Sequence, residues 1–146
     1  MSFPPLLKLK GRTNVNLYIN FLSYLGVALL LLVLGIILFT ISTPKLKEFR
    51  LIAEKNVTAA MSLGGKVIGL AIVLGAAAEY SVSLIDMVIW GVIGIVSQII
   101  VFILAEVITI RFSIHQAIEE DNRAVGTMLL SLSLAIGWIL AKCLSY

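Results

Sequence analysis

The chain is poor in the residues that form catalytic and metal-binding sites. Only 13% of its residues are charged, against about 25% in a soluble domain. Its single cysteine, Cys143, excludes a disulfide within the chain. Its single histidine, His115, has no second histidine or cysteine at metal-ligand spacing. We therefore expect neither a metal site nor a cofactor.

Sequence motifs of known enzymes are absent as well. The chain contains no His-Glu-x-x-His motif and no phosphate-binding loop. No serine or cysteine is paired with a plausible histidine base. The chain has a net charge of +3, but its basic residues form no long stripe, which argues against nucleic-acid binding. We expect a protein that is not an enzyme and has no catalytic residues.

What the chain does have is apolar sequence, at 60% of all residues. A helix needs about 20 apolar residues to cross a bilayer, and four runs meet this length. These runs are Leu17–Ile41, Val57–Ala78, Leu84–Ile110 and Ala124–Cys143. The first is too long for the core of a cleaved signal peptide, so residues 1–16 are expected to be a basic N-terminal segment before a retained helix. The predicted fold is an all-α integral membrane protein in a lipid bilayer.

The two halves of the chain resemble each other when shifted by about 66 residues. Thr43 then aligns with Thr109, and Asn56 with Asn122. We interpret residues 17–78 and 84–143 as two parallel two-helix repeats, with chance similarity of apolar helices as the alternative.

Basic residues give a weak prediction of orientation. The two polar links carry Lys45, Lys47, Arg50, Lys55, Arg111 and Arg123, and the other side carries Lys8, Lys10, Arg12 and Lys142. Because positive loops favour the cytoplasm, the links are predicted to be cytoplasmic and both termini outside.

The links also carry helix signals. Thr43 and Pro44 are typical of a helix start, and Leu46, Phe49 and Ile52 would share one face. This pattern predicts a short helix on the lipid headgroups, with a solvated loop as the alternative.

Two asparagines each precede an apolar run. Asn56 and Asn122 are expected to cap the helices that follow them, and a role in a gate or ligand site is the alternative.

Three polar residues fall inside the predicted spans. Lys66 and Gln98 lie near mid-depth in neighbouring helices, and Glu106 lies closer to the links. Such residues are costly in a bilayer and usually face other helices or water. They are candidates either for a polar pathway or for helix-to-helix contacts, with Lys66 bonded to Gln98 and Glu106.

Small residues at helical spacing predict close helix packing, within one chain or between chains. The candidates are Ala60, Gly64, Gly65, Gly69, Gly91 and Gly94.

Four parts of the chain resemble the sequence pattern of a known family. They are Glu54-x-Asn56-x2-Ala59-Ala60-x3-Gly64-Gly65-x2-Ile68-Gly69, Trp90-Gly91, Gln98 and Asn122-x-Ala124-Val125-Gly126. Over about residues 17–143 the chain resembles the domain-of-unknown-function-350 family, the YjfL-like bacterial inner-membrane proteins. The resemblance implies a multi-pass protein of the bacterial inner (plasma) membrane with two related units and no established activity. It also implies a possible membrane-stress partner protein. Lys66 departs from the family pattern, which is apolar at this position.

Two hypotheses of function follow. The first is a homo-oligomeric channel or small-solute conduit, lined by the second and third helices with Lys66 and Gln98 as polar contacts. The second is a structural or membrane-stress scaffold whose links recruit a cytoplasmic partner. A secondary transporter, with Glu106 as a proton site, is a third possibility.

Overall fold

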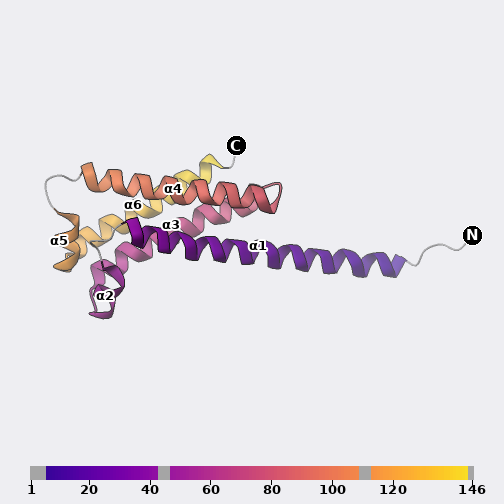
Figure 1. Cartoon of the computed structure of the whole chain (residues 1–146), viewed down its shortest axis with the longest axis horizontal. Helices are drawn as coiled ribbons and strands as arrows, with labels where there is room; N and C mark the ends of the chain where they lie inside the picture. The colour runs from indigo at the N-terminus through magenta and orange to yellow at the C-terminus, as the bar shows by residue number, and fades with distance from the viewer. Residues whose placement is uncertain (1–5, 43–46, 109–112, 145–146) are drawn as a thin grey trace, which may run out of the picture.

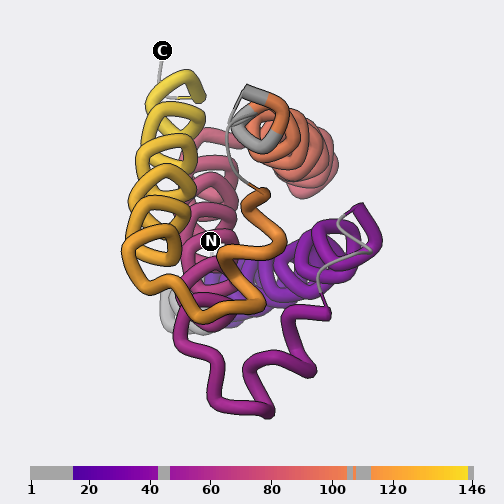
Figure 2. Tube along the Cα trace, turned by 90° about the vertical axis from the view of Figure 1, so that its left-hand side faces the viewer, coloured from indigo at the N-terminus to yellow at the C-terminus, as the bar shows by residue number. Residues whose placement is uncertain are grey.

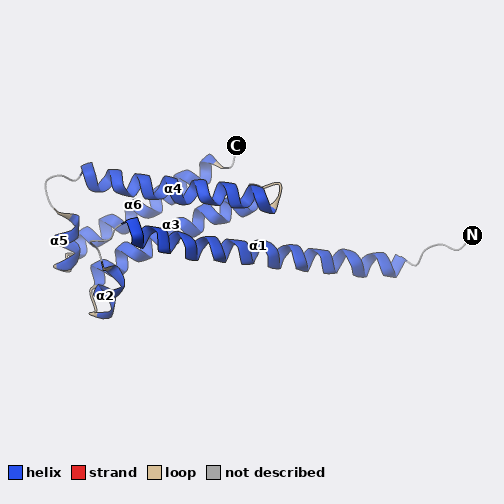
Figure 3. Cartoon of the chain, viewed as in Figure 1, coloured by secondary structure: helices blue, strands red, loops and turns tan. Residues whose placement is uncertain are grey.

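The computed structural model describes residues 6–42, 47–108 and 113–144, and for residues 6–14, 105, 106 and 108 it describes the backbone alone. All regular secondary structure in this described part is helical (Figure 3). The elements are α1 (Leu6–Ser42), α2 (Glu48–Ala53), α3 (Val57–Tyr80), α4 (Leu84–Ile108), α5 (Ile114–Glu119) and α6 (Arg123–Cys143).

The four long helices lie side by side, with α2 and α5 together at one end (Figure 1). α1 and α4 run toward that end, and α3 and α6 run away from it. The segments long and apolar enough to span a membrane are Val15–Ser42, Val57–Tyr80, Leu84–Leu104 and Arg123–Cys143. The predicted all-α fold with four spanning helices is confirmed.

The first helix is longer than its apolar run predicted. It begins at Leu6 rather than at Leu17, and it extends beyond the other helices (Figure 1). Helix α1 therefore includes most of the expected N-terminal segment 1–16. Lysine and arginine are good helix formers, so the basic residues there are compatible with this extension.

Helix α3 is the central helix of the bundle, with α1, α4 and α6 around it (Figure 2). Its most extensive packing is against α6. A Cβ atom built on Gly65 would lie 2.8 Å from the Cα of Leu130, and one on Gly137 would lie 2.5 Å from the carbonyl oxygen of Gly69. No real side chain fits at these distances, so glycine allows the two backbones to approach this closely.

Helix α2 ends in a tight reversal of the backbone. Lys55 has a positive φ of 66°, and the N–H groups of Asn56 and Lys55 donate to the carbonyls of Leu51 and Ile52, each at 2.9 Å. This is the Schellman arrangement, which satisfies the last carbonyls of a helix. The Asn56 side chain then accepts the N–H of Ala59 at 2.7 Å, so one residue ends α2 and begins α3.

The end of α5 has the same local geometry. Asp121 has a φ of 53°, and the N–H of Asn122 donates to the Ala117 carbonyl at 2.9 Å. The Asn122 side chain accepts the N–H of Val125 at 3.4 Å and caps α6. The two links thus make the same turn at matching positions, and duplication of the whole two-helix unit stays a prediction.

The short helices pack on the core rather than only lying at its surface. Ile114 and Ile118 of α5 are buried in an apolar cluster with Phe39 and Phe102, and Ile52 of α2 packs against it. Phe49, in contrast, is 57% exposed, and Leu46 lies outside the described residues. Of the residues expected to share one apolar face of the first link, Ile52 therefore packs on the core and Phe49 points outward.

The expected helix start at Thr43 and Pro44 also lies outside the described residues. Helix α2 begins at Glu48, and its N-cap residue, Lys47, makes no side-chain capping bond.

Candidate functional site: a buried ion pair beneath two aromatic rings

A buried ion pair joins the first link to the central helix. The Nζ of Lys66, in α3, lies 2.6 Å from Oε1 of Glu48, the first residue of α2, and their side chains are only 2% and 1% exposed. The hydroxyl of Ser62, one turn before Lys66, donates to the same carboxylate oxygen at 3.0 Å. A charge removed from water needs such a partner, so the pair explains how Lys66 can lie inside an apolar helix bundle.

Two aromatic rings close over the ammonium group. The Lys66 Nζ lies 4.2 Å from the ring centroid of Phe102 and 5.8 Å from that of Phe39. The rings themselves meet edge to face, with centroids 6.3 Å apart. This geometry stabilises the cation through the ring faces and separates it from the surroundings.

Several buried polar atoms around this pair have no hydrogen-bond partner among the described residues. They are the second carboxylate oxygen of Glu48 and both amide atoms of Gln98. Buried polar atoms are normally satisfied by protein or by water. We call Glu48, Ser62, Lys66 and Gln98 together the polar seam.

Gln98, in α4, lies beside Gly69, which is about one helical turn farther along α3 than Lys66, and no hydrogen bond joins Gln98 to Lys66 among the described residues. A Cβ atom on Gly69 would clash with the Gln98 Nε2 atom, which places the amide beside the contact between α3 and α6. Of the three polar residues expected to come together, Lys66 and Gln98 are both buried. The Glu106 side chain lies outside the described part of the chain.

Sequence reasoning missed Glu48, which takes the place expected for Gln98 and Glu106 as the partner of Lys66. The signal was present, because Glu48 precedes Leu51 by three residues and Ile52 by four. Residues at these spacings share one face of a helix. A glutamate on the apolar face of a short helix, near a lysine that needs a counter-charge, was therefore a candidate partner.

The link end of α3 is also held by the second link. The Asn56 Nδ2 donates to the carbonyl of Ile118 at 2.5 Å, and Asp121 Oδ1 accepts the N–H of Thr58 at 2.7 Å. This backbone hydrogen bond lowers the pKa of Asp121 below its usual value. The start of α3 is therefore bound by residues of both links.

The small residues expected at helix contacts divide into two groups. A Cβ atom on Gly65, Gly69, Gly91 or Gly94 would collide with a neighbouring helix of the same chain. In contrast, Gly64 faces open space, and Ala60 is exposed. A packing role for these last two residues therefore stays a prediction, and it would concern a second copy of the chain.

The described side chains form no group of three or more histidine, cysteine, aspartate or glutamate residues that could hold a metal ion. The Ser62 hydroxyl beside this pair donates its proton to the Glu48 carboxylate. What the site offers chemically is paired charge and unfilled hydrogen-bonding capacity inside an apolar bundle.

Comparison with known proteins places the chain in a family. A family model, Domain of Unknown Function (DUF350), matches residues 13–144. The UPF0719 transmembrane protein YshE of Bacillus subtilis is 36% identical over 126 residues, covering 86% of this chain and 93% of that protein. The UPF0719 inner membrane protein YjfL of Escherichia coli K12 is 29% identical with the same coverage.

No solved structure matches this chain significantly. The names of these relatives and the four helices of spanning length confirm the predicted multi-pass location in the bacterial inner membrane. The chain belongs to the DUF350 family of membrane proteins.

Proposed function

We propose that the chain forms a homo-oligomeric conduit for small ions or polar solutes, and that the structure is its closed state. The observation that carries this proposal is Gln98, whose two buried amide atoms have no partner among the described residues. An unsatisfied amide inside a membrane helix bundle is costly unless water or a solute reaches it. The proposal is for a membrane conduit and not an enzyme, and it assigns no catalytic residue.

The ion pair then acts as the gate at the link end. Lys66 and Glu48 are almost fully buried, and the rings of Phe39 and Phe102 cover the ammonium group. In this proposal α2 moves when a solute passes along the polar seam, because α2 carries Glu48 and has only six residues. A six-residue helix costs less to displace than a spanning helix, since it buries less surface.

Several copies would complete the pathway. The three long helices around α3 leave no wide passage within one chain, because the α6 side of α3 is occupied by close backbone contacts. Ala60, Gly64 and Gly75 lie on α3 without a close neighbour, so they leave room for another helix. The proposal includes the internal repeat. The similar turns that end α2 and α5 would give the two repeat units similar faces toward a second copy of the chain.

The conduit is tested by flux through liposomes that contain the purified full chain. We expect wild-type protein to pass potassium, chloride or protons, and Gln98→Leu to lower that flux about tenfold, because an apolar side chain leaves the solute without a polar contact. The matched control is Gln116→Leu, at the exposed glutamine of α5, which should leave the flux unchanged. Absence of flux from folded wild-type protein, or equal losses in both variants, would reject the conduit.

A second candidate is a scaffold that recruits a cytoplasmic partner, and the exposure of Phe49 favours it. A separate pocket of about 410 Å³ is lined by Lys47, Arg50, Leu51, Glu54 and Glu119. Aromatic side chains are enriched at protein contacts.

The scaffold predicts that Phe49→Ser abolishes co-purification of a partner from membranes of the native host, while flux in liposomes is unaffected. Val57→Ser, at an exposed apolar residue of the neighbouring helix α3, serves as the control. Equal recovery of partners by wild type and Phe49→Ser would exclude this surface.

A further inference from the structure

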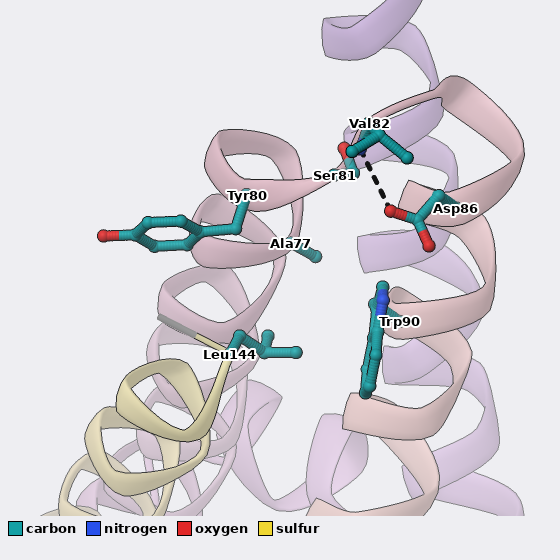
Figure 4. Close-up of a pocket in the computed structure, with 7 residues that line it drawn as sticks. All are labelled: Ala77, Tyr80, Ser81, Val82, Asp86, Trp90 and Leu144. Atoms are coloured by element: carbon teal, nitrogen blue, oxygen red, sulfur yellow. Dashed lines mark hydrogen bonds between the residues drawn. The ribbon is translucent and has the colours of Figure 1, made fainter. Parts of the chain in front are cut away.

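A second polar site lies at the opposite end of the bundle, where the turn between α3 and α4 meets the end of α6 (Figure 4). A pocket of about 250 Å³ is lined there by Ala77, Tyr80, Ser81, Val82, Asp86, Trp90 and Leu144. A water molecule takes about 30 Å³ of liquid, so the pocket has room for a small organic group. Among the described residues of this lining, Asp86 is the one that carries a charge.

The carboxylate of Asp86 is only partly used by the fold. Its Oδ2 atom accepts the N–H of Val82 at 3.0 Å, and its own N–H donates to the Ser83 hydroxyl at 3.2 Å. Ser83 thus caps the start of α4, and the Asp86 carboxylate holds the residue that precedes this cap. An ionised carboxylate has about four acceptor positions, and no basic side chain pairs with Asp86 within the described residues. Its negative charge thus lacks a counter-charge in that part of the chain.

The neighbours of Asp86 are suited to an organic cation. Trp90 lies one helical turn further along α4, and its ring and the carboxylate both project toward the α3 side of the pocket (Figure 4). Ser81 also lines the pocket, and its hydroxyl is buried without a partner among the described residues. Indole binds ammonium groups through its face. Calcium and magnesium, in contrast, require six or more oxygen ligands, which this lining does not supply.

We propose that this pocket binds an alkylammonium group. The Asp86 carboxylate supplies the counter-charge, the Trp90 ring supplies a cation–π surface, and Ser81 accepts a hydrogen bond from a primary ammonium. A lipid headgroup or a soluble amine carries this group, and both would reach a pocket at the end of the spanning helices. The inference uses none of the polar seam and is therefore independent of the conduit.

Fluorescence of Trp90 tests the site. The chain has two tryptophans, so Trp138→Phe leaves Trp90 as the sole reporter. Full-length protein in detergent is titrated with ethylammonium or tetramethylammonium chloride, against sodium chloride of equal ionic strength. We expect a saturable change with both organic ions, and binding about tenfold weaker in Asp86→Asn, which loses the charge but keeps an acceptor for Val82. Glu79→Gln is the matched control, since Glu79 is an exposed acid that lines the neighbouring cleft.

A second variant separates recognition from stability. Ser81→Ala should weaken ethylammonium binding and leave tetramethylammonium binding unchanged, because only the primary ion donates a hydrogen bond. The proposal is overturned if sodium chloride gives the same response, if Glu79→Gln weakens binding as much as Asp86→Asn, or if Asp86→Asn binds like wild type.

Reconstitution distinguishes the two sources of the amine. If the natural ligand is a lipid headgroup, phosphatidylethanolamine vesicles should abolish the response to added ethylammonium, and phosphatidylglycerol vesicles should preserve it. If the ligand is a soluble amine, the response should be the same in both lipids.

Discussion

Lys66→Met is expected to lower the free energy of unfolding by about 3–5 kcal/mol, the usual cost of removing one partner of a buried pair. Glu48 would be left at 1% exposure without its counter-charge, with one oxygen already unpartnered among the described residues and the other left with Ser62 alone. Unfolding by sodium dodecyl sulfate in mixed micelles, followed by circular dichroism, measures this change.

The exposed pair on the same short helix is the matched control. Arg50 and Glu54 lie 2.9 Å apart at 69% and 55% exposure, so Arg50→Met should cost less than about 1 kcal/mol. The double variant Glu48→Met/Lys66→Met should regain most of the lost stability, because apolar side chains often replace a buried pair at little cost. A Lys66→Met cost no larger than that of Arg50→Met would contradict the burial of the pair.

Gly137→Ala is expected to give the second large effect. A single methyl group would lie 2.5 Å from the carbonyl oxygen and 2.6 Å from the Cα of Gly69, and both of these are backbone atoms that no rotamer change can move. Overpacking of this kind costs about 1–3 kcal/mol, so α3 and α6 should separate more easily under the same detergent titration.

Gly64→Ala provides the comparison, because its Cβ atom would meet nothing within 4 Å. Alanine is the better helix former by about 1 kcal/mol in water, so this variant should be neutral or more stable. If Gly137→Ala were as stable as Gly64→Ala, the close contact between α3 and α6 would be incorrect.

The four spans and their order were predictable because length and hydropathy are local properties of each segment. The turns were also accessible, since Asn56 and Asn122 stand directly before apolar runs. The sequence could not show that α2 folds back over α3, because this depends on contacts between residues far apart in the chain. Glu48 therefore remained unassigned, although it pairs with Lys66.

The rotation of each helix was the other missing quantity. Gly64 and Gly65 are adjacent and differ by about 100° around a helix of 3.6 residues per turn, so their spacing to later glycines could not decide which one faces a neighbour. The structure turns Gly65 toward α6 and leaves Gly64 in open space. Gly137, which makes the closest backbone approach in α6, was not among the expected packing residues, although Ser133 precedes it and Ala141 follows it by four positions.

The contact between α3 and α6 has a consequence for biosynthesis. The ribosome must add the 66 residues from Val57 to Arg123 before the partner of α3 begins to emerge, which takes roughly 3–13 s at about 5–20 residues per second. During this interval the glycine-lined side of α3 faces lipid or the insertion machinery, without the helix that covers it in the finished protein. The nascent protein can therefore complete the packing of α3 only after α6 has been synthesised.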